Sequence, residues 1–410
     1  MRIVAVLPHF TPDLAPTGII GARLITELGA LGVRTDVVTS LPWYQKHAVE
    51  DAWKGRLKHV ERTGFGTITR LHPFPTGDKR SIPKRAVGFS AFCAASALQG
   101  SLGPRVDAVL AMSPPLPIAA TGWLVAKARR APFVLNIQDV FPDAAVELGA
   151  LTNPQAIRAG EELEKWSYNR AQAVTVLSED MRANLAAKTD PAKLHVIPNF
   201  ADTDAIRPGP RDNAYRREYG LGDKTVVMYA GNVGMSQSLE LMVEAARHFR
   251  DRDDLVFVVN GVGSGLKPLR ELAAGLDNIV FAPMQPLDRL PEVLAAADLH
   301  LVLLHTGLAK ASVPSKIYSI LSAARPALAS VDRGTEIERI ITESGAGAVV
   351  GPDDGPAFVR ALDELLSGPD GLAARGAAGR RWVEAELTPA GVARHYADLL
   401  EDVVTRRRGA

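Results

Sequence analysis

Short runs of β-branched and aliphatic residues alternate with longer segments of helical periodicity along almost the whole chain. This alternation is typical of βαβ units, in which helices cover the faces of a parallel sheet. In the first half, the predicted strands are 3–7, 35–39, 108–110, 133–137, 173–176 and 194–197, and the predicted helices are 18–31, 86–98, 118–129, 156–170 and 179–187. The runs 58–61 and 67–71 flank Gly64-Phe65-Gly66 and predict an inserted hairpin.

The pattern stops at residues 198–210, which are rich in proline and other turn residues, and then resumes. Predicted strands follow at 226–229, 256–259, 279–281, 299–303, 327–329 and 348–350, with helices at 239–249, 266–274, 287–295, 314–323, 336–343 and 356–366. A chain of 410 residues is too long for a single hydrophobic core. We therefore predict an α/β protein with two Rossmann-like, doubly wound domains, at 1–205 and 206–388. A last helix within 389–410 is expected to pack back on the first domain.

Composition excludes several classes of protein. The 47 basic and 46 acidic residues balance, so no overall field attracts nucleic acid. A single cysteine, Cys93, rules out an internal disulfide framework and fits a reducing compartment. The apolar run at the N-terminus is too short for a signal peptide, and the charge-free run 86–104 is interrupted by glycine and serine. We expect a cytoplasmic protein without a membrane-spanning helix.

Ligands of open parallel sheets bind beyond the carboxyl ends of the strands, so the loops that follow the strands are the places to search. The first such loop, residues 8–18, lacks the G-x-G-x-x-G of a dinucleotide site. Thr17 and Gly18 lie where a helix begins, which favours an anion near the backbone amides. An ordinary helix start explains them equally well. His9, in the same loop, is either a ligand contact or, as we favour, a loop histidine without a role.

Glycine-rich loops follow two consecutive strands of the second half. One contains Gly231 and Asn232, and the other contains Gly263 within Asn260-Gly261-Val262-Gly263-Ser264-Gly265. Glycine allows the backbone to approach a phosphate closely, and the helices that follow offer their positive ends. This pair of loops predicts a nucleotide site in the second domain.

A further loop carries the main candidate cation. Pro314 favours a first helical turn, which places Ser315 and Lys316 beside free amides. Lys316 can then stabilise a leaving diphosphate; the alternative is an ordinary solvated lysine. Glu336, after a later strand, is either a helix-capping acid or a ligand of a sugar hydroxyl. Neither the histidines nor Asp202-Thr203-Asp204, which we interpret as a turn, support a metal site.

Taken together, these stretches resemble glycosyltransferase family 4, whose members are retaining, metal-independent enzymes of the GT-B fold. The branch that the chain resembles most contains bacterial surface-polysaccharide transferases related to the fucosamine transferases. The resemblance spans nearly the whole chain and rests on residues 10–12, 17–18, 138–143, 177–179, 197–199, 231–232, 313–316 and 334–336.

The resemblance implies two facing domains with a cleft between them, and it implies roles for particular residues. Lys316 would stabilise the leaving group, Asp139 would orient the acceptor, and Glu336 would hold the donor sugar. Asp139 and Thr17 would lie on the acceptor side. The donor side would comprise Gly18, Gly231, Asn232, Gly263, Ser315 and Ser319.

The sequence departs from the family pattern at charged positions. Asn232 and Gln237 stand where many members have arginine and lysine, and the family's Glu-x7-Glu motif falls on Ala311 and Ser319. Either Lys316, Ser319 and backbone amides hold the donor in this branch, or donor binding is weaker.

The implied reaction needs no cofactor or metal. It moves a sugar from a nucleotide sugar, expected to be UDP-linked, to a saccharide or polyprenyl-linked acceptor of the cell envelope. A basic cluster formed by Lys79, Arg80, Lys84 and Arg85 precedes an apolar helix and suggests contact with the inner membrane face. The alternative functions are a nucleotide-sugar epimerase of the same architecture and a non-catalytic nucleotide-sugar-binding protein.

Overall fold

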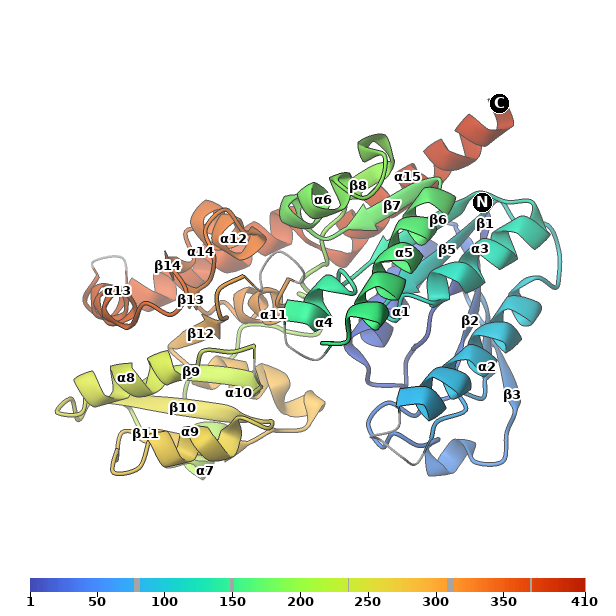
Figure 1. Cartoon of the computed structure of the whole chain (residues 1–410). Coiled ribbons are helices and arrows are strands. Elements are labelled where there is room, and N and C mark those ends of the chain that lie inside the picture. The colour runs from blue at the N-terminus through green and yellow to red at the C-terminus, as the bar shows by residue number, and fades with distance from the viewer. Residues whose placement is uncertain (77–81, 148–150, 235, 308–312, 369–370, 410) are drawn as a thin grey trace. The chain divides into compact units, whose positions relative to one another are not determined.

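The computed structural model describes residues 1–410 except 77–81, 148–150, 235, 308–312, 369–370 and 410. It consists of two compact units (Figure 1). Unit 1 comprises Met1–Asn199 together with Pro389–Ala410, and unit 2 comprises Phe200–Thr388. The last helix therefore belongs to the first unit, and the division lies at Asn199 where the sequence suggested 205.

Within the described residues, unit 1 contains an eight-stranded sheet in the order β3-β4-β2-β1-β5-β6-β7-β8. Only β3 runs antiparallel to its neighbour. The strands are β1 (Arg2–Val6), β2 (Arg34–Ser40), β3 (Lys58–Thr63), β4 (Gly66–Leu71), β5 (Ala108–Ser113), β6 (Phe133–Ile137), β7 (Ala173–Val176) and β8 (Leu194–Val196). The predicted hairpin is confirmed as β3 and β4, and β4 also pairs with β2 in parallel.

Strand burial follows position in the sheet. Every residue of the central strands β5 and β6 is buried, as expected for a parallel sheet that is covered on both faces. The edge strand β3 has no buried residue and carries charged side chains, which discourages pairing with another chain.

Helices α2, α3 and α5 lie next to one another in front of this sheet in Figure 1. The helices of unit 1 are α1 (Pro16–Ala30), α2 (Ile82–Gly100), α3 (Ile118–Arg129), α4 (Asp143–Glu147), α5 (Pro154–Arg170), α6 (Glu179–Ala186) and α15 (Pro389–Gly409). Two of them show clear start signals. Asn153 accepts hydrogen bonds from two backbone amides at the start of α5, and Ser178 accepts one at the start of α6.

Helix α15 is held to unit 1 by packing against α1 and by specific polar contacts. The buried Tyr396 hydroxyl accepts a hydrogen bond from Asn136 Nδ2 at 2.6 Å and lies 3.2 Å from Thr175 Oγ1. Near its end, Arg408 donates to Asp107 at 2.8 Å. These contacts join the C-terminal segment to strands β6 and β7.

Unit 2 contains a six-stranded parallel sheet in the order β11-β10-β9-β12-β13-β14 over the described residues. Its strands are β9 (Thr225–Asn232), β10 (Leu255–Val262), β11 (Ile279–Pro283), β12 (Leu299–Leu303), β13 (Ala327–Ser330) and β14 (Gly347–Val350). Strand order reverses direction between β9 and β12, the position at which doubly wound sheets bind ligands. Doubly wound topology is confirmed in both units.

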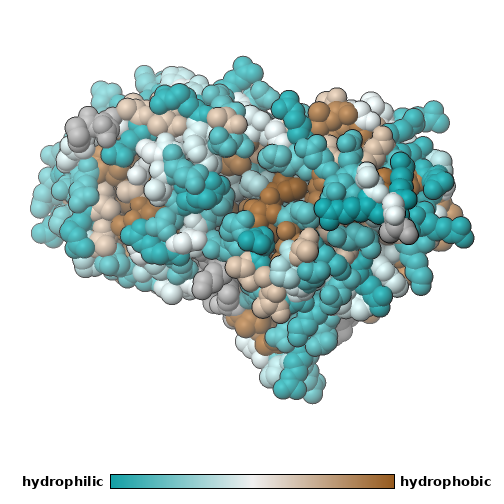
Figure 2. All heavy atoms as spheres, turned by 90° about the horizontal axis from the view of Figure 1, so that it is seen from above, coloured by the Kyte–Doolittle hydropathy of each residue, from teal (hydrophilic) through white to brown (hydrophobic). Residues whose placement is uncertain are grey.

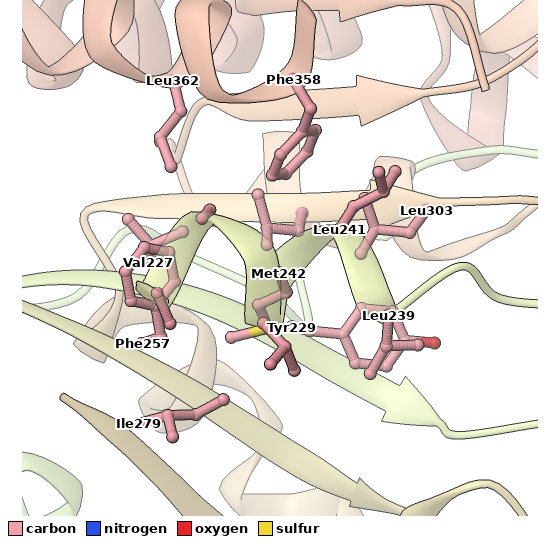
Figure 3. Close-up of a cluster of buried hydrophobic side chains, with 14 of the residues drawn as sticks. Val227, Tyr229, Leu239, Leu241, Met242, Phe257, Ile279, Leu303, Phe358 and Leu362 are labelled. Atoms are coloured by element: carbon pink, nitrogen blue, oxygen red, sulfur yellow. The ribbon is translucent and has the colours of Figure 1, made fainter. Parts of the chain in front are cut away.

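The helices of unit 2 are α7 (Ala214–Glu218), α8 (Glu240–His248), α9 (Leu266–Leu272), α10 (Leu290–Ala296), α11 (Lys316–Ser322), α12 (Glu336–Ser344), α13 (Gly355–Ser367) and α14 (Gly371–Glu386). Figure 3 shows Phe358 and Leu362 of α13 pointing toward α8 and the strands beneath it. Tyr229 of β9 belongs to the same buried cluster. The sequence did not predict α4, α7 or α14.

Among the described residues, no helix is long and apolar enough to cross a bilayer. Hydrophilic side chains cover most of the face shown in Figure 2. Lys79 and Arg80 of the predicted basic cluster lie outside the described residues, as do the side chains of Lys84 and Arg85 at the start of α2.

Candidate functional site

The glycines predicted to approach a phosphate also allow two strands of unit 2 to approach each other. A Cβ atom on Gly261 would lie 2.3 Å from the Gly231 carbonyl oxygen, and one on Gly263 would lie 2.0 Å from the Val233 carbonyl oxygen. Gly231 and Gly263 have φ values of +143° and +155°, a region that favours glycine. The two glycine loops therefore come together at the carboxyl ends of β9 and β10.

Lys316, the first residue of α11, brings its ammonium group to this edge. Its Nζ atom lies 3.7 Å from the centre of the buried Tyr229 ring and 3.2 Å from where a Cβ atom of Gly231 would lie. The residue is partly exposed, but Nζ is inaccessible to solvent and has no hydrogen-bond partner among the described residues. The Nζ atom lies over the ring face and is shielded from solvent, which contradicts the interpretation of Lys316 as a solvated surface lysine.

Burial has an electrostatic consequence for this lysine. Removal of the ammonium from water disfavours its charged form and lowers the pKa of Lys316 from 10.5 to about 7. The Tyr229 ring attracts the cation but supplies no negative charge. An anion arriving at this edge would therefore raise the pKa of Lys316 again and favour its charged form.

Hydrogen bonds hold the β9 loop in place. The Tyr229 hydroxyl donates to the Asn232 carbonyl oxygen at 2.6 Å, and Gln237 Oε1 accepts from the Gly234 amide at 2.9 Å. Gln237 therefore fixes the loop conformation at a position where many family members place a cation. The Asn232 side chain is exposed at the end of β9.

Glu336 lies buried in the first turn of α12, where Arg339 pairs with it at 2.7 Å. Glu338, two residues later, accepts from the Gly334 amide through Oε2 at 2.6 Å. The Glu336 carboxylate, although it is paired with Arg339, can still accept a hydrogen bond from a sugar hydroxyl. Of the other residues predicted in unit 2, Ser315 is exposed immediately before α11 and Ser319 is half-buried within it, while Ala311 lies outside the described residues.

In unit 1, Gly18 and Asp139 follow β1 and β6, which β5 separates in the sheet. A Cβ atom on Gly18 would lie 2.9 Å from His9 Cβ, so the glycine makes room for the loop that precedes it. Thr17 is half-buried beside it at the start of α1, and Asp139 is half-buried after β6.

Two motif segments of unit 1 do meet. Gln138, next to Asp139, accepts a hydrogen bond from Asn199 Nδ2 at 2.8 Å and donates to Asn136 Oδ1 at 2.8 Å. This buried amide network fixes the backbone on which Asp139 is placed.

His9, for which the sequence favoured no role, lies in a network of polar contacts. Its Nδ1 atom lies 2.7 Å from Oδ2 of the fully buried Asp13, whose Oδ1 accepts the Tyr44 amide at 3.1 Å. The buried Arg70 guanidinium donates to the carbonyl oxygens of Phe10 and Thr11. Polar groups thus brace the whole β1–α1 loop. In the sequence, this contact is indicated only by the position of Asp13, four residues after His9.

Beside this loop lies a cavity of about 400 Å³. Its lining is dominated by aromatic and proline side chains: Pro8, His9, Ser40, Trp43, Tyr44, His47, Pro73, Phe74, Pro75, Thr76, Phe89, Phe92 and Pro115. The sequence did not reveal this cavity because its lining residues come from five separate segments.

Comparison with known proteins supplies a family. The glycosyl transferase 4-like domain family matches residues 21–199, and the glycosyl transferases group 1 family matches residues 224–368. The chain is 29% identical to the putative colanic acid biosynthesis glycosyl transferase WcaI of Escherichia coli K12, over 89% of this chain and 92% of that protein. It is 32% identical to the probable glycosyltransferase WbjE of Pseudomonas aeruginosa, over 71% and 74%.

The fold agrees with this assignment. The crystal structure of Anabaena Alr3699/HepE in complex with UDP-glucose superposes with a TM-score of 0.71 at 14% identity, covering 98% of this chain and 100% of that one. Two doubly wound units, both family matches and the relatives lead to one conclusion: the chain belongs to glycosyltransferase family 4, of the GT-B fold.

Proposed function

We propose that the protein transfers a sugar, with retention at the anomeric carbon, from a nucleoside diphosphate sugar to a saccharide acceptor of a surface polysaccharide. The observation that carries this proposal is the Lys316 ammonium, which lies beside Gly231 at the carboxyl end of β9 without a hydrogen-bond partner among the described residues.

The chemistry of glycosyl transfer gives this cation its role. As the bond to the anomeric carbon breaks, negative charge grows on the departing diphosphate, and a nearby positive charge lowers the barrier. In the free protein, Nζ lies over Tyr229 and is covered. Donor binding therefore involves rotation of the lysine side chain from the ring toward the diphosphate, which the amides of Gly231 and Asn232 also contact.

The donor is expected to be UDP-linked. HepE, which shares the fold, has been crystallised with UDP-glucose, and this supports a nucleotide-sugar site in unit 2. Gly263 would contact the nucleotide, and Ser315, Ser319 and Gly18 would complete the donor side. The buried Glu336 would accept a hydrogen bond from the donor sugar.

Polysaccharide synthesis is supported by WcaI, whose name assigns it to colanic acid biosynthesis. Asp139 and Thr17 would orient the acceptor. An assay with a free saccharide and with a polyprenyl-linked saccharide distinguishes the two forms of acceptor. We further propose that the reaction needs no metal or other cofactor, and that it takes place at the cytoplasmic face of the membrane.

The test is a transfer assay with UDP- and GDP-sugars, run with saccharide and polyprenyl-linked acceptors and with EDTA. Lys316→Ala should lower turnover by orders of magnitude, whereas Lys267→Ala, at an exposed position of unit 2, should leave it unchanged. NMR of the product should show the donor's anomeric configuration. Near-normal turnover of Lys316→Ala would contradict the role of the lysine. Loss of activity in EDTA would contradict metal independence, and an inverted product would contradict retention.

A further inference from the structure

Residues 304–307, which we call the exit loop, follow β12 at the carboxyl edge of the unit 2 sheet. Strand β12 lies between β9 and β13, at the point where strand order reverses (Figure 1). The Leu304 amide continues the pairing of β12 with β13 by donating to the Ser330 carbonyl oxygen at 3.0 Å. The backbone therefore leaves the sheet beside the loop that carries Gly231 and Asn232.

The other three amides of the exit loop donate to groups from three different strand ends. One acceptor follows β9, one follows β13 and one follows β14. The exit loop is thus joined to all of these strand ends. The pairs are His305 with the Ser236 carbonyl oxygen at 3.2 Å, Thr306 with Asp353 Oδ2 at 3.2 Å, and Gly307 with Asp332 Oδ2 at 2.8 Å.

Asp353 makes more of these contacts than any other partner named above. Its Oδ2 atom also accepts from Thr306 Oγ1 at 3.0 Å, and its Oδ1 atom accepts from His305 Nδ1 at 2.9 Å. Burial alone would raise the pKa of Asp353, but the hydrogen bonds from His305 and Thr306 lower it below its ordinary value of 3.8. At neutral pH the carboxylate is therefore ionised and accepts from the loop through both oxygens.

The backbone of Asp353 has a conformation that favours glycine. Its φ is +57°, a region that aspartate tolerates better than most residues but that still carries strain. The side chain is 42% exposed, so core packing does not explain its presence. Strained residues persist where surrounding contacts hold them, and they cluster at ligand sites. Here the contacts that hold Asp353 are those to the exit loop.

The exit loop is joined in turn to the loop after β9. Besides the amide contact to Ser236, the Leu304 carbonyl oxygen accepts from the buried Ser238 Oγ at 3.3 Å. These two serines flank Gln237, whose side chain accepts from the Gly234 amide. A displacement of the exit loop would therefore shift the loop that is proposed to contact the diphosphate.

We infer that Asp353 is a positioning residue of the donor site. Through His305 and Thr306 it holds the exit loop, and with it the loop after β9, in the conformation that receives the diphosphate. The inference rests on the proposed function, because the ligand is the nucleoside diphosphate proposed there. Asp353 acts through the loop, since an acidic group that faced the diphosphate directly would repel it.

The test compares Asp353→Gly, Asp353→Asn and Asp354→Ala in the full chain. Glycine relaxes the backbone but removes the contacts, so the melting temperature should stay close to that of the wild type. Asparagine keeps an oxygen that can accept from Thr306 and an amide that can donate to His305. Asp354→Ala is the matched structural control, because it removes the cap that accepts from the Ala357 amide at the start of α13 and should lower stability.

Titration calorimetry with UDP and GDP measures the effect on the site. Asp353→Gly should bind the preferred nucleotide about tenfold more weakly than the wild type, equivalent to about 1.4 kcal/mol, and Asp353→Asn should restore affinity to within about threefold. Asp354→Ala should bind as tightly as the wild type despite its lower melting temperature. Hydrogen exchange of the Thr306 amide should be faster in Asp353→Gly than in the wild type or in Asp353→Asn.

Three results would overturn the inference while leaving the proposed function intact. They are equal affinity of the wild type and Asp353→Gly, equal weakening in Asp353→Gly and Asp354→Ala, and failure of Asp353→Asn to restore binding. Failure of the wild type to bind either nucleotide would instead contradict the proposed function, and the inference with it.

Discussion

Replacement of Lys316 by methionine should stabilise unit 2 of the free protein at neutral pH. Methionine keeps most of the side-chain volume above Tyr229 but carries no charge to desolvate. The folded pKa of about 7 lies below the unfolded value of 10.5, so between these limits the unfolded chain binds more protons than the folded one. Wild-type stability therefore rises with pH across this window, and the advantage of the variant is greatest at pH 7 and below.

The magnitude follows from the same values. The gap between 10.5 and about 7, at about 1.4 kcal/mol per pH unit, corresponds to about 5 kcal/mol of cost for the buried charge. Attraction to the Tyr229 ring at 3.7 Å offsets about 2 kcal/mol of it. We expect the variant to gain about 3 kcal/mol near pH 6, equivalent to about 6–12 °C in melting temperature for a unit of this size.

The assay is thermal and urea unfolding at pH 6, 7, 8 and 9. It compares the wild type with Lys316→Met and with the exposed-site control Lys267→Met. The difference for Lys316→Met should shrink steadily as pH rises, and Lys267→Met should differ little from wild type throughout. A destabilised Lys316→Met protein, or a gain independent of pH, would refute the reasoning that this lysine is held at an energetic cost.

Two further substitutions test one contact in each unit. Gly263→Ala would place a Cβ atom 2.0 Å from the Val233 carbonyl oxygen at a φ of +155°, so it should cost about 2 kcal/mol or more and weaken UDP binding, as measured by urea unfolding and calorimetry; unchanged values would show that the two loops do not need this close approach. Tyr396→Phe removes the hydroxyl that accepts from Asn136, and should lower the stability of unit 1 by about 1–2 kcal/mol in urea; no loss would mean that this contact does not help to hold α15.

The fold was largely predictable because periodicity is a property of the sequence itself. Buried strands such as β1, whose residues 3–6 are all apolar, are continuous apolar runs, and the helices between them have regular amphipathic spacing or clear caps. Helix α14 was not predicted because Gly376 and Gly379 are residues that disfavour a helix interior. In the structure both are required by close packing, since a Cβ atom on Gly376 would lie 2.1 Å from the Ala324 carbonyl oxygen.

Only those features of the candidate site that depend on neighbouring residues in the sequence could be predicted. Lys316 could be selected from Pro314 and the strand before it, but its placement over Tyr229, 87 positions earlier, depends on the pairing of β9 with β12. The cavity beside His9 depends on five segments brought together by sheet order, and no spacing reveals such an arrangement.

The central claim is that unit 2 binds a nucleoside diphosphate through the Lys316 ammonium. Titration calorimetry with UDP and GDP at pH 8.5, in two buffers of different ionisation enthalpy, measures both affinity and proton uptake. Bringing a diphosphate to Lys316 raises its pKa from about 7, so one of the nucleotides should bind with uptake of up to one proton, and Lys316→Met should bind more weakly without that uptake. Absence of binding by either nucleotide, or equal proton uptake in the wild type and Lys316→Met, would contradict the account.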